Sequence, residues 1–337
     1  MTRDLYWDSL KFVLIFLVIY GHTIDGHTPD GSFNRAMYSF IYMFHMPLFI
    51  FISGRFSHIR DKKKYIKGIL RLFETYVVSQ IILTAISVIY GDNFTINYLT
   101  TPNYVLWYLV ALIYWRLIVY FFPLKWLRFR FLLIILSLII SILAGFIPIS
   151  RPFSIQTALA FMPFFVIGYF SVDINIRKYI NMVPWGISFI IFFSAFLLLY
   201  FIFNRDLSFM HHCAFPYWID SLEHTIMSIG ARCLFIFTAT VLGAMLMRLV
   251  PTVEIMSKWG SKTLFIYIFH SIIIKGGVSP LITLGYIPQN EGFLFVYTII
   301  ITCGLLYLSK IKLFNIMLNP ISYCCNKKQE PQRQHKK

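Results

Sequence analysis

The sequence contains little charge. Only 13% of its 337 residues are Asp, Glu, Lys or Arg, about half of the roughly 25% that soluble domains carry. Because 58% of the residues are hydrophobic, a soluble fold of this length could not cover its surface with polar groups. The 35 Phe and 21 Tyr exclude a disordered chain. The composition therefore indicates an integral membrane protein.

Cysteine is scarce, and no two cysteines have the spacing of metal ligands. We predict unpaired thiols and no bound metal. Asp4 and Asp8 precede the first apolar run, which continues into a hydrophobic chain, so we expect no cleavable signal. The five cysteines are Cys213, Cys233, Cys303, Cys324 and Cys325.

Apolar segments close to the ~20 residues needed to cross a bilayer recur along the chain. They predict an all-α, polytopic helix bundle with about ten transmembrane helices. The predicted spans are 10–27, 37–57, 70–90, 104–122, 131–149, 156–173, 183–203, 227–249, 263–283 and 293–310.

The positions of the basic residues predict the orientation. With a cytoplasmic N-terminus, 24 of the 30 Lys and Arg residues lie in cytoplasmic segments or helix ends, and only Arg35, Arg151 and Arg205 lie in outer loops. This bias follows the positive-inside rule and places both termini in the cytoplasm. The net charge of +16 then faces the anionic lipids of the inner leaflet, so no nucleic acid is needed as a partner.

The chain is predicted to consist of a transmembrane domain and a tail. Residues 1–312 form the predicted transmembrane domain, and residues 313–337 form a basic, disordered cytoplasmic tail. The longest outer loop, 204–226, holds polar residues in a spacing that matches no closed zinc site, and we interpret them as solvated. They are His211, His212, Asp220, Glu223 and His224.

Ionisable residues inside spans are costly and mark function. In the first span, Lys11 and His22 are eleven positions apart. At ~3.6 residues per turn this is about three turns, so both side chains share one face, about 16 Å apart along the axis. Lys11 lies at the cytoplasmic end and His22 toward the outer leaflet. A snorkelling lysine with an interfacial histidine is the alternative.

In the second span, His45 and Pro47 lie near the middle. They predict an interrupted helix whose unpaired backbone groups line a cavity; a kink with a structurally bonded His45 is the alternative. The following basic loop contains Lys67 and Arg71, which are four positions apart and share a helix face. An anchor to the inner leaflet would also explain these two cations.

Three further side chains are candidates. Trp107 belongs to an aromatic cluster at the outer interface, where it either forms part of an aromatic belt or stacks on a sugar. Arg116 is deeper in the same span and should face the protein interior. His270 is a third histidine within a span, suited either to a bond between helices or to catalysis.

These features resemble the membrane acyltransferase-3 family, and in particular its fucose-4-O-acetylase-like branch. The resemblance covers about residues 5–310 and depends on the order and spacing of several motifs. Two positions depart from the family pattern: Lys11 replaces the more usual Arg, and Arg55 stands where an aromatic residue is typical. The matching motifs are Asp8, Lys11 with His22, residues 44–54 (FHMPLFIFISG), 106–109 (LWYL), 164–169 (FFVIGY) and 267–270 (YIFH).

The resemblance implies transfer of an acetyl or other acyl group from cytoplasmic acyl-CoA to a hydroxyl of a cell-surface or exported polysaccharide. Acetyl-CoA would be a co-substrate, with no bound cofactor. Lys11, Lys67 and Arg71 are placed to bind CoA phosphates, and His22 suits a general base. Asp25, three residues further on, would orient the His22 ring.

The remaining candidates have supporting or substrate-contacting roles: His45, Ser53, Trp107, Arg116 and His270. We expect direct transfer in a ternary complex, with a covalent acyl-His22 intermediate as the variant. The nucleophile is not expected to be Ser53, because a Ser-Gly pair after an interrupted helix has a sufficient backbone explanation.

The expected location is the bacterial cytoplasmic membrane, as a multi-pass protein. Partners would be the acyl-CoA donor, a glycan or lipid-linked sugar acceptor, membrane lipids and other polysaccharide-assembly proteins. A transporter or flippase for a glycan or lipid-linked sugar is the competing class, since interrupted helices and buried charges also line translocation paths. A sensory or scaffold domain is the third, but it would not require the Lys11–His22 alignment.

Overall fold

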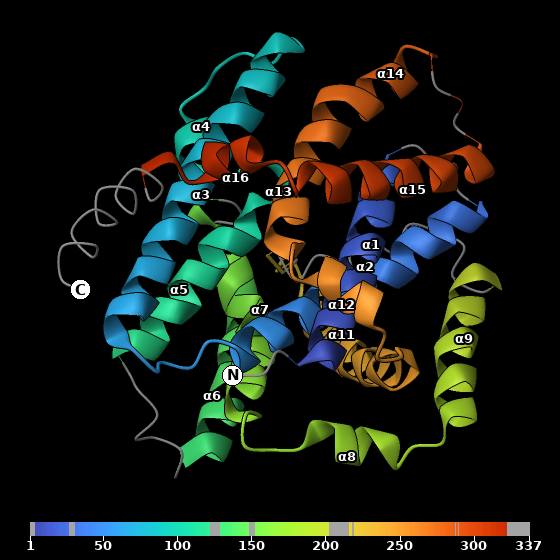
Figure 1. Ribbon diagram of the computed structural model, residues 1–337. Helices are drawn as coiled ribbons and strands as arrows, with labels where there is room; N and C mark the ends of the chain where they lie inside the picture. Colours follow the sequence, from blue (N-terminus) through green and yellow to red (C-terminus); the bar gives the residue numbers. More distant parts are fainter. Residues whose placement is uncertain are drawn as a thin grey trace.

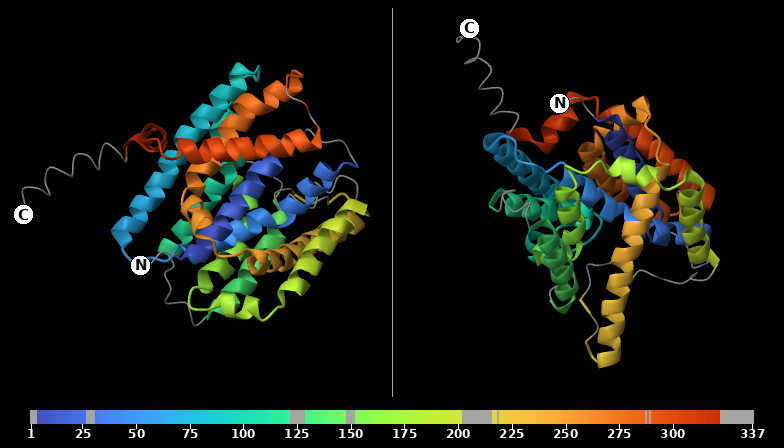
Figure 2. Two further views of the ribbon diagram at one scale, coloured as in Figure 1. Left: turned by 45° about the vertical axis from the view of Figure 1, so that its right-hand side comes forward. Right: turned by 90° about the horizontal axis from the view of Figure 1, so that it is seen from below.

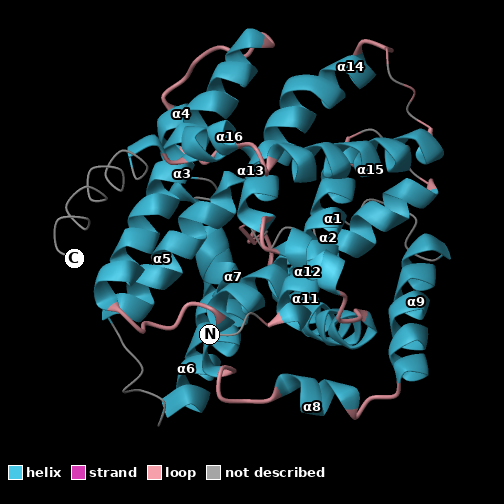
Figure 3. Cartoon of the chain, viewed as in Figure 1, coloured by secondary structure: helices cyan, strands magenta, loops and turns pink. Residues whose placement is uncertain are grey.

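The computed structural model describes residues 4–26, 31–121, 129–147, 152–201, 216–217, 219–286, 288 and 290–321. All regular structure in these residues is helical (Figure 3), which confirms the all-α prediction. Several predictions concern residues outside these ranges. They are those on Arg3, Lys125, Arg128, Arg151, Arg205, His211, His212, Cys213, Cys324, Cys325 and the basic end 322–337.

Within the described ranges, eight helical segments are long and apolar enough to cross a membrane. Two shorter apolar helical segments coincide with the fifth and seventh predicted spans. Every predicted span therefore corresponds to a helix. The eight are α1 (Leu5–Ile24), α2 (Phe33–Arg55), α3 (Lys62–Ile89), η1 with α5 (Tyr104–Leu106, Trp107–Phe121), η4 with α7 (Pro152–Ser154, Ile155–Phe170), α11 (Leu222–Leu249), α13 with η5 and α14 (Thr263–Ile273, Ile274–Val278, Ser279–Thr283) and α15 (Glu291–Leu308); the two shorter ones are α6 with η3 (Arg130–Leu143, Ala144–Phe146) and α9 (Trp185–Phe201).

The helices α1 and α2 form the centre of the bundle (Figures 1 and 2). Both are mostly buried, and α1 packs against α2, α13, α15 and the short α12 (Glu254–Gly260). By contrast, α3, α11 and α15 leave most of their residues uncovered and present large apolar side chains such as Ile81, Phe237 and Ile300 at the periphery. Such an apolar exterior is expected where lipid replaces water.

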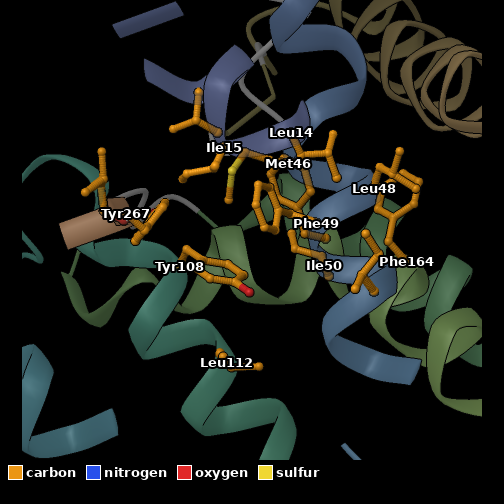
Figure 4. Packing of buried hydrophobic residues seen from close by; sticks show 14 of the residues in the cluster. Leu14, Ile15, Met46, Leu48, Phe49, Ile50, Tyr108, Leu112, Phe164 and Tyr267 are labelled. Carbon is orange, nitrogen blue, oxygen red and sulfur yellow. Dashed lines mark hydrogen bonds between the residues drawn. The ribbon is translucent and has the colours of Figure 1, made fainter. Parts of the chain in front are cut away.

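The core joins helices from distant parts of the chain. Figure 4 shows Leu14 of α1 and Met46 and Phe49 of α2 beside Tyr108 of α5, with Tyr267 of α13 next to it. The rings of Tyr108 and Tyr267 lie 5.3 Å apart. The helices that form this core also carry the polar residues described below.

Two glycines allow α2 and α7 to approach each other more closely than side chains would permit. A Cβ atom on Gly54 would lie 2.1 Å from the Phe165 carbonyl oxygen, and one on Gly168 would lie 2.0 Å from the Phe51 carbonyl oxygen. Small residues at such contacts bring backbones together in membranes, where packing replaces the hydrophobic drive between helices. Gly54 and Gly168 belong to two motifs of the family pattern, which thus have a structural explanation.

The predicted interruption of the second span is wrong. The helix α2 continues through Pro47 to Arg55. Proline removes one backbone hydrogen bond but breaks a membrane helix only where its neighbours fail to hold it. Here α1, α7, α9 and α11 all pack against α2, and these contacts keep it continuous.

The first residues of the predicted tail are helical. Residues 313–318 belong to α16 (Lys312–Leu318), in which Leu318 is buried and Phe314 packs against Phe269 with ring centroids 5.6 Å apart. Just beyond the helix, the Asn319 side chain accepts a hydrogen bond of 3.1 Å from Thr75 of α3. Apolar burial therefore extends the ordered domain beyond the boundary drawn at residue 312.

We predict that Gly54→Ala destabilises the protein, because overpacking against a backbone carbonyl typically costs ~1–3 kcal/mol. Thermal unfolding in detergent, followed by size-exclusion chromatography, would measure a lower Tm. Gly304→Ala in α15 is the matched control, since a Cβ atom there meets nothing within 4 Å. Equal Tm values for the two variants would contradict the close α2–α7 contact.

Candidate active site

His22 lies in the last turn of α1 and is held by tyrosines from two other segments. Its Nδ1 atom lies 2.9 Å from the Tyr104 hydroxyl and 3.1 Å from the Tyr42 hydroxyl. The imidazole ring contacts both phenol rings, with centroids 4.8 Å and 5.8 Å apart. In the described part of the chain, both side-chain hydrogen bonds of His22 involve Nδ1 and neither involves Nε2.

Tyr38 and Asp25 lie beyond the tyrosines that hold His22. Asp25 is the residue that ends α1, and the rings of Tyr38 and Tyr42 pack with centroids 4.1 Å apart. The Tyr42 and Tyr104 hydroxyls either donate to Nδ1 or accept from it, according to the tautomer of His22. A general base needs the tautomer in which Nδ1 carries the proton and Nε2 the lone pair.

Tyr104 reaches His22 from a strained backbone position. Its φ angle of 52° lies in the left-handed region, where an aromatic residue is a genuine outlier. The preceding loop is held by Gln80 of α3, whose amide donates to the carbonyls of Tyr98 and Thr101 and accepts from the Asn103 N–H at 2.8–3.0 Å. Strain of this kind persists where the surroundings fix it, which is common at functional sites.

His45 and His270 lie next to this cluster. His45 Nδ1 lies 2.7 Å from the Ile41 carbonyl oxygen, and His270 Nδ1 lies 3.1 Å from that of Ile266. Because a carbonyl only accepts, each Nδ1 carries the proton and each Nε2 of the neutral ring carries a lone pair. The rings of His22 and His270 are 5.4 Å apart, and the buried His270 Nε2 has no hydrogen-bond partner among the described residues.

His45 contacts Tyr42, with ring centroids 4.9 Å apart. Among the described residues, the side-chain hydrogen bonds of His45 and His270 both stay within their own helices. For His270, the structural alternative was a hydrogen bond to another helix. The structure shows instead a hydrogen bond to the backbone of its own helix. The structure brings His22, His45 and His270 together around Tyr42, where the end of α1 meets the middle of α2 and α13, and Asp25 follows at the end of α1.

Three candidates lie apart from this cluster. Ser53 is hydrogen-bonded to the Tyr108 hydroxyl at 2.6 Å, two helical turns beyond His45. The Trp107 ring packs against Phe161 with centroids 5.3 Å apart. Arg116 faces α3, where its Nη1 atom lies 3.8 Å from the Cβ position of Gly68, between Lys67 and Arg71 in the sequence.

The predicted phosphate-binding residues are at the opposite end from His22. Lys11 forms a 2.6 Å ion pair with the buried Asp8 and lies over the Phe56 ring, whereas Lys67 and Arg71 are exposed on α3. The unusual Arg55 joins the end of α2 to the segment after α7: its guanidinium donates to the carbonyl and hydroxyl of Ser171. It also covers the Trp7 ring at 4.9 Å.

Sequence reasoning missed Tyr38, Tyr42 and Tyr104, because tyrosine is too common in this chain to stand out. It also missed two cations within spans, Lys275 and Arg232. Of the 30 Lys and Arg residues, only these two and Arg116 fall neither in the cytoplasmic segments nor in the outer loops. The positions of the basic residues could therefore have identified them. Arg232 is buried, donates to the Ser141 carbonyl at 2.9 Å and covers the ring of Tyr217.

The outer loop gives no metal site in the part of it that is described. His224 Nδ1 is hydrogen-bonded to the Asp220 carboxylate at 2.8 Å, and both side chains are exposed. This hydrogen bond is the main cause of the lowered pKa of Asp220. Among the described residues, no group of three His, Cys, Asp or Glu side chains could hold a metal ion.

The chain belongs to the acyltransferase-3 family: the family pattern, described as an acyltransferase domain, matches residues 4–309. Two curated relatives are similar over short segments. The nodulation protein NolL of Sinorhizobium fredii is 41% identical over 56 residues, 16% of this chain and 15% of the relative. NolL of Mesorhizobium japonicum is 44% identical over 59 residues, 17% of this chain and 16% of the relative. No solved structure matches this chain.

We predict that Tyr42→Phe and Tyr104→Phe each lower the kcat of acyl transfer about tenfold, because each removes one of the two hydroxyls that hold His22 Nδ1. The double variant Tyr42→Phe/Tyr104→Phe should lose more, since it removes both partners of Nδ1. Steady-state kinetics with membranes containing equal amounts of protein would measure these effects.

Tyr114→Phe is the matched control, because its hydroxyl bonds the Phe153 carbonyl away from His22. The KM for acyl-CoA and the Tm should stay near wild type in the two single variants. A loss of Tm in proportion to the loss of activity would show that the tyrosines only support the fold.

Proposed function

We propose that the protein is a membrane-bound O-acetyltransferase, which moves an acetyl group from cytoplasmic acetyl-CoA to a hydroxyl of a cell-surface or exported polysaccharide. One observation carries this proposal. His22 stands at one end of α1 with Nδ1 engaged by tyrosine hydroxyls and Nε2 left for substrate, while Lys11 stands at the other end. The proposed membrane is the bacterial cytoplasmic membrane, with both termini inside.

The proposed reaction uses His22 as the base. Nε2 takes the proton of the acceptor hydroxyl, and the oxygen attacks the carbonyl carbon of the thioester. The C–S bond then breaks, and the CoA thiolate receives the proton from the imidazolium. An O-acyl ester and CoA result, and His22 is neutral again. A covalent acyl-His22 intermediate is the variant of this scheme.

The hydrogen-bond partners of His22 stabilise the imidazolium that forms. As Nε2 gains a proton, both ring nitrogens become donors, and the Tyr42 and Tyr104 hydroxyls accept at Nδ1. In this proposal the Asp25 carboxylate balances the charge from beyond Tyr38 and Tyr42. In a site that excludes water such fixed partners act strongly, because the local dielectric is low. Asp25 therefore serves as a positioning residue that acts through two tyrosines.

The donor enters from the inner face in this proposal. A pantetheine arm would extend along α1 over the ~16 Å between Lys11 and His22. Lys67 and Arg71 remain candidates for the CoA phosphates because they are exposed on α3 at its inner end. Arg116 approaches the same segment at Gly68 and adds a third cation there.

The transport alternative was based on interrupted helices and buried charges. The first of these does not apply to the second span, because α2 is continuous.

We predict that His22→Ala lowers acetyl transfer by about 10²- to 10⁴-fold, the usual contribution of a positioned base. Membranes with wild type or variant at matched levels receive labelled acetyl-CoA on the cytoplasmic side. Alkali-labile label in the surface polysaccharide is then counted. His224→Ala, an exposed histidine paired with Asp220, is the control and should label like wild type. Equal labelling by His22→Ala would exclude His22 as the base.

We also predict that Lys11→Ala raises the KM for acetyl-CoA about tenfold with little change in kcat, because an interaction with the CoA phosphates is lost while the base is intact. Initial rates at varied acetyl-CoA would show this. The control is Lys258→Ala, which removes another lysine from an acidic partner at the predicted inner face, the exposed pair with Glu254 at 2.9 Å. A fall in kcat alone would assign Lys11 to another step.

A further inference from the structure

A second polar site adjoins His22 on the predicted outer side. A pocket of about 430 Å³ lies between the loop before α5, Pro152 and η5. Its lining includes Asn103, Tyr104 and Lys275. Tyr104 belongs to both places, since its hydroxyl lies 2.9 Å from His22 Nδ1. A molecule in this pocket is therefore one tyrosine side chain away from the proposed base.

Lys275 provides a cation in the pocket wall. It lies in η5, a π-helical turn inside a span, and such turns often mark functional sites. Its Nζ atom donates to the Asn103 side-chain oxygen at 2.9 Å, and this partner is neutral. Within the described residues Lys275 forms no ion pair. The carboxylate whose charge acts on it, Asp92, is exposed and accepts a hydrogen bond from Tyr98 instead.

Asn103 fixes the cation in the pocket wall. Its side chain is 9% exposed, and its oxygen accepts from Lys275. A neutral amide oxygen leaves the positive charge of Lys275 uncompensated, and the ammonium group has further N–H donors for the oxygens of an anion.

We infer that this pocket binds an anionic group of the acceptor, so that the enzyme modifies an acidic rather than a neutral glycan. The anion is a sugar carboxylate or the phosphate of a lipid-linked sugar, and both would accept from Lys275. The inference rests on the proposed function and adds the class of acceptor to it. An anion held here lies on the far side of Tyr104 from His22, so another part of the same acceptor would extend to the His22 ring.

The test uses the glycan that wild type labels with acetyl-CoA. Oligosaccharides from it are assayed before and after reduction of their carboxyl groups with carbodiimide and borohydride. Lipid-linked oligosaccharides are assayed before and after release of the phosphate. Loss of acceptor activity after the first treatment identifies the carboxylate, and loss after the second identifies the phosphate.

Two variants test the residues. Lys275→Met should raise the KM for the native acceptor at least tenfold and leave the KM for acetyl-CoA unchanged, and Lys275→Arg should restore most of the loss. Asn103→Asp is nearly isosteric and pairs Lys275 internally, so it should raise the same KM. Lys258→Met, the loss of an exposed lysine on α12, is the charge-matched control and should behave like wild type.

Three results would overturn the inference. The first is that the labelled glycan contains no acidic group, and the second is that both treatments leave it as good an acceptor as before. The third is that Lys275→Met lowers activity on native and neutralised acceptors equally and also lowers the Tm, as expected if the bond to Asn103 is purely structural. Absence of any label with wild type is a separate result, because it refutes the proposed acetyl transfer itself.

Discussion

The rest of the site depends on the hydrogen bond between His22 Nδ1 and Tyr42. A bilayer offers no water to satisfy polar groups, so a histidine in a span needs partners from the protein. Those partners then decide which ring nitrogen carries the proton. At His22 two hydroxyls, those of Tyr42 and Tyr104, meet at Nδ1 and leave Nε2 outside these hydrogen bonds. At His45 and His270 backbone carbonyls place the proton on Nδ1.

The glycine contact between α2 and α7 helps to position these polar residues, although it lies at the far end of α2. Tyr38, Tyr42 and His45 share one face of α2 at helical spacing. Gly54 fixes the other end of the same helix against Gly168 and Phe165. A rigid helix held closely at one end presents its polar face at a defined place at the other. The same helix therefore makes the close contact with α7 and presents the polar residues. This explains why α2 must stay continuous despite Pro47.

The sequence predicted the helices well because hydropathy and length measure the property that a bilayer selects. It also predicted His22 as the central residue, because a histidine in a span is rare enough to be noticed. It did not predict the tyrosines that orient His22. With 21 Tyr in the chain, only contacts between distant segments distinguish Tyr104 from an interfacial aromatic. Pro47 led to the wrong expectation that the second span is interrupted. The rule that proline breaks helices is local, whereas the packing of four neighbouring helices keeps α2 continuous.

The three basic residues left within spans differ in how far the protein satisfies their charge. Arg232 has a backbone carbonyl and an aromatic face, both groups that a guanidinium binds well. Arg116 lies at the contact between α3 and α5, close to Gly68. Lys275 donates to one neutral amide oxygen, that of Asn103, and forms no ion pair within the described residues. A cation in a span is costly unless paired. Of the three, Lys275 therefore has the charge that the described residues compensate least, and this is the physical reason for the anion that we infer in the pocket beside it.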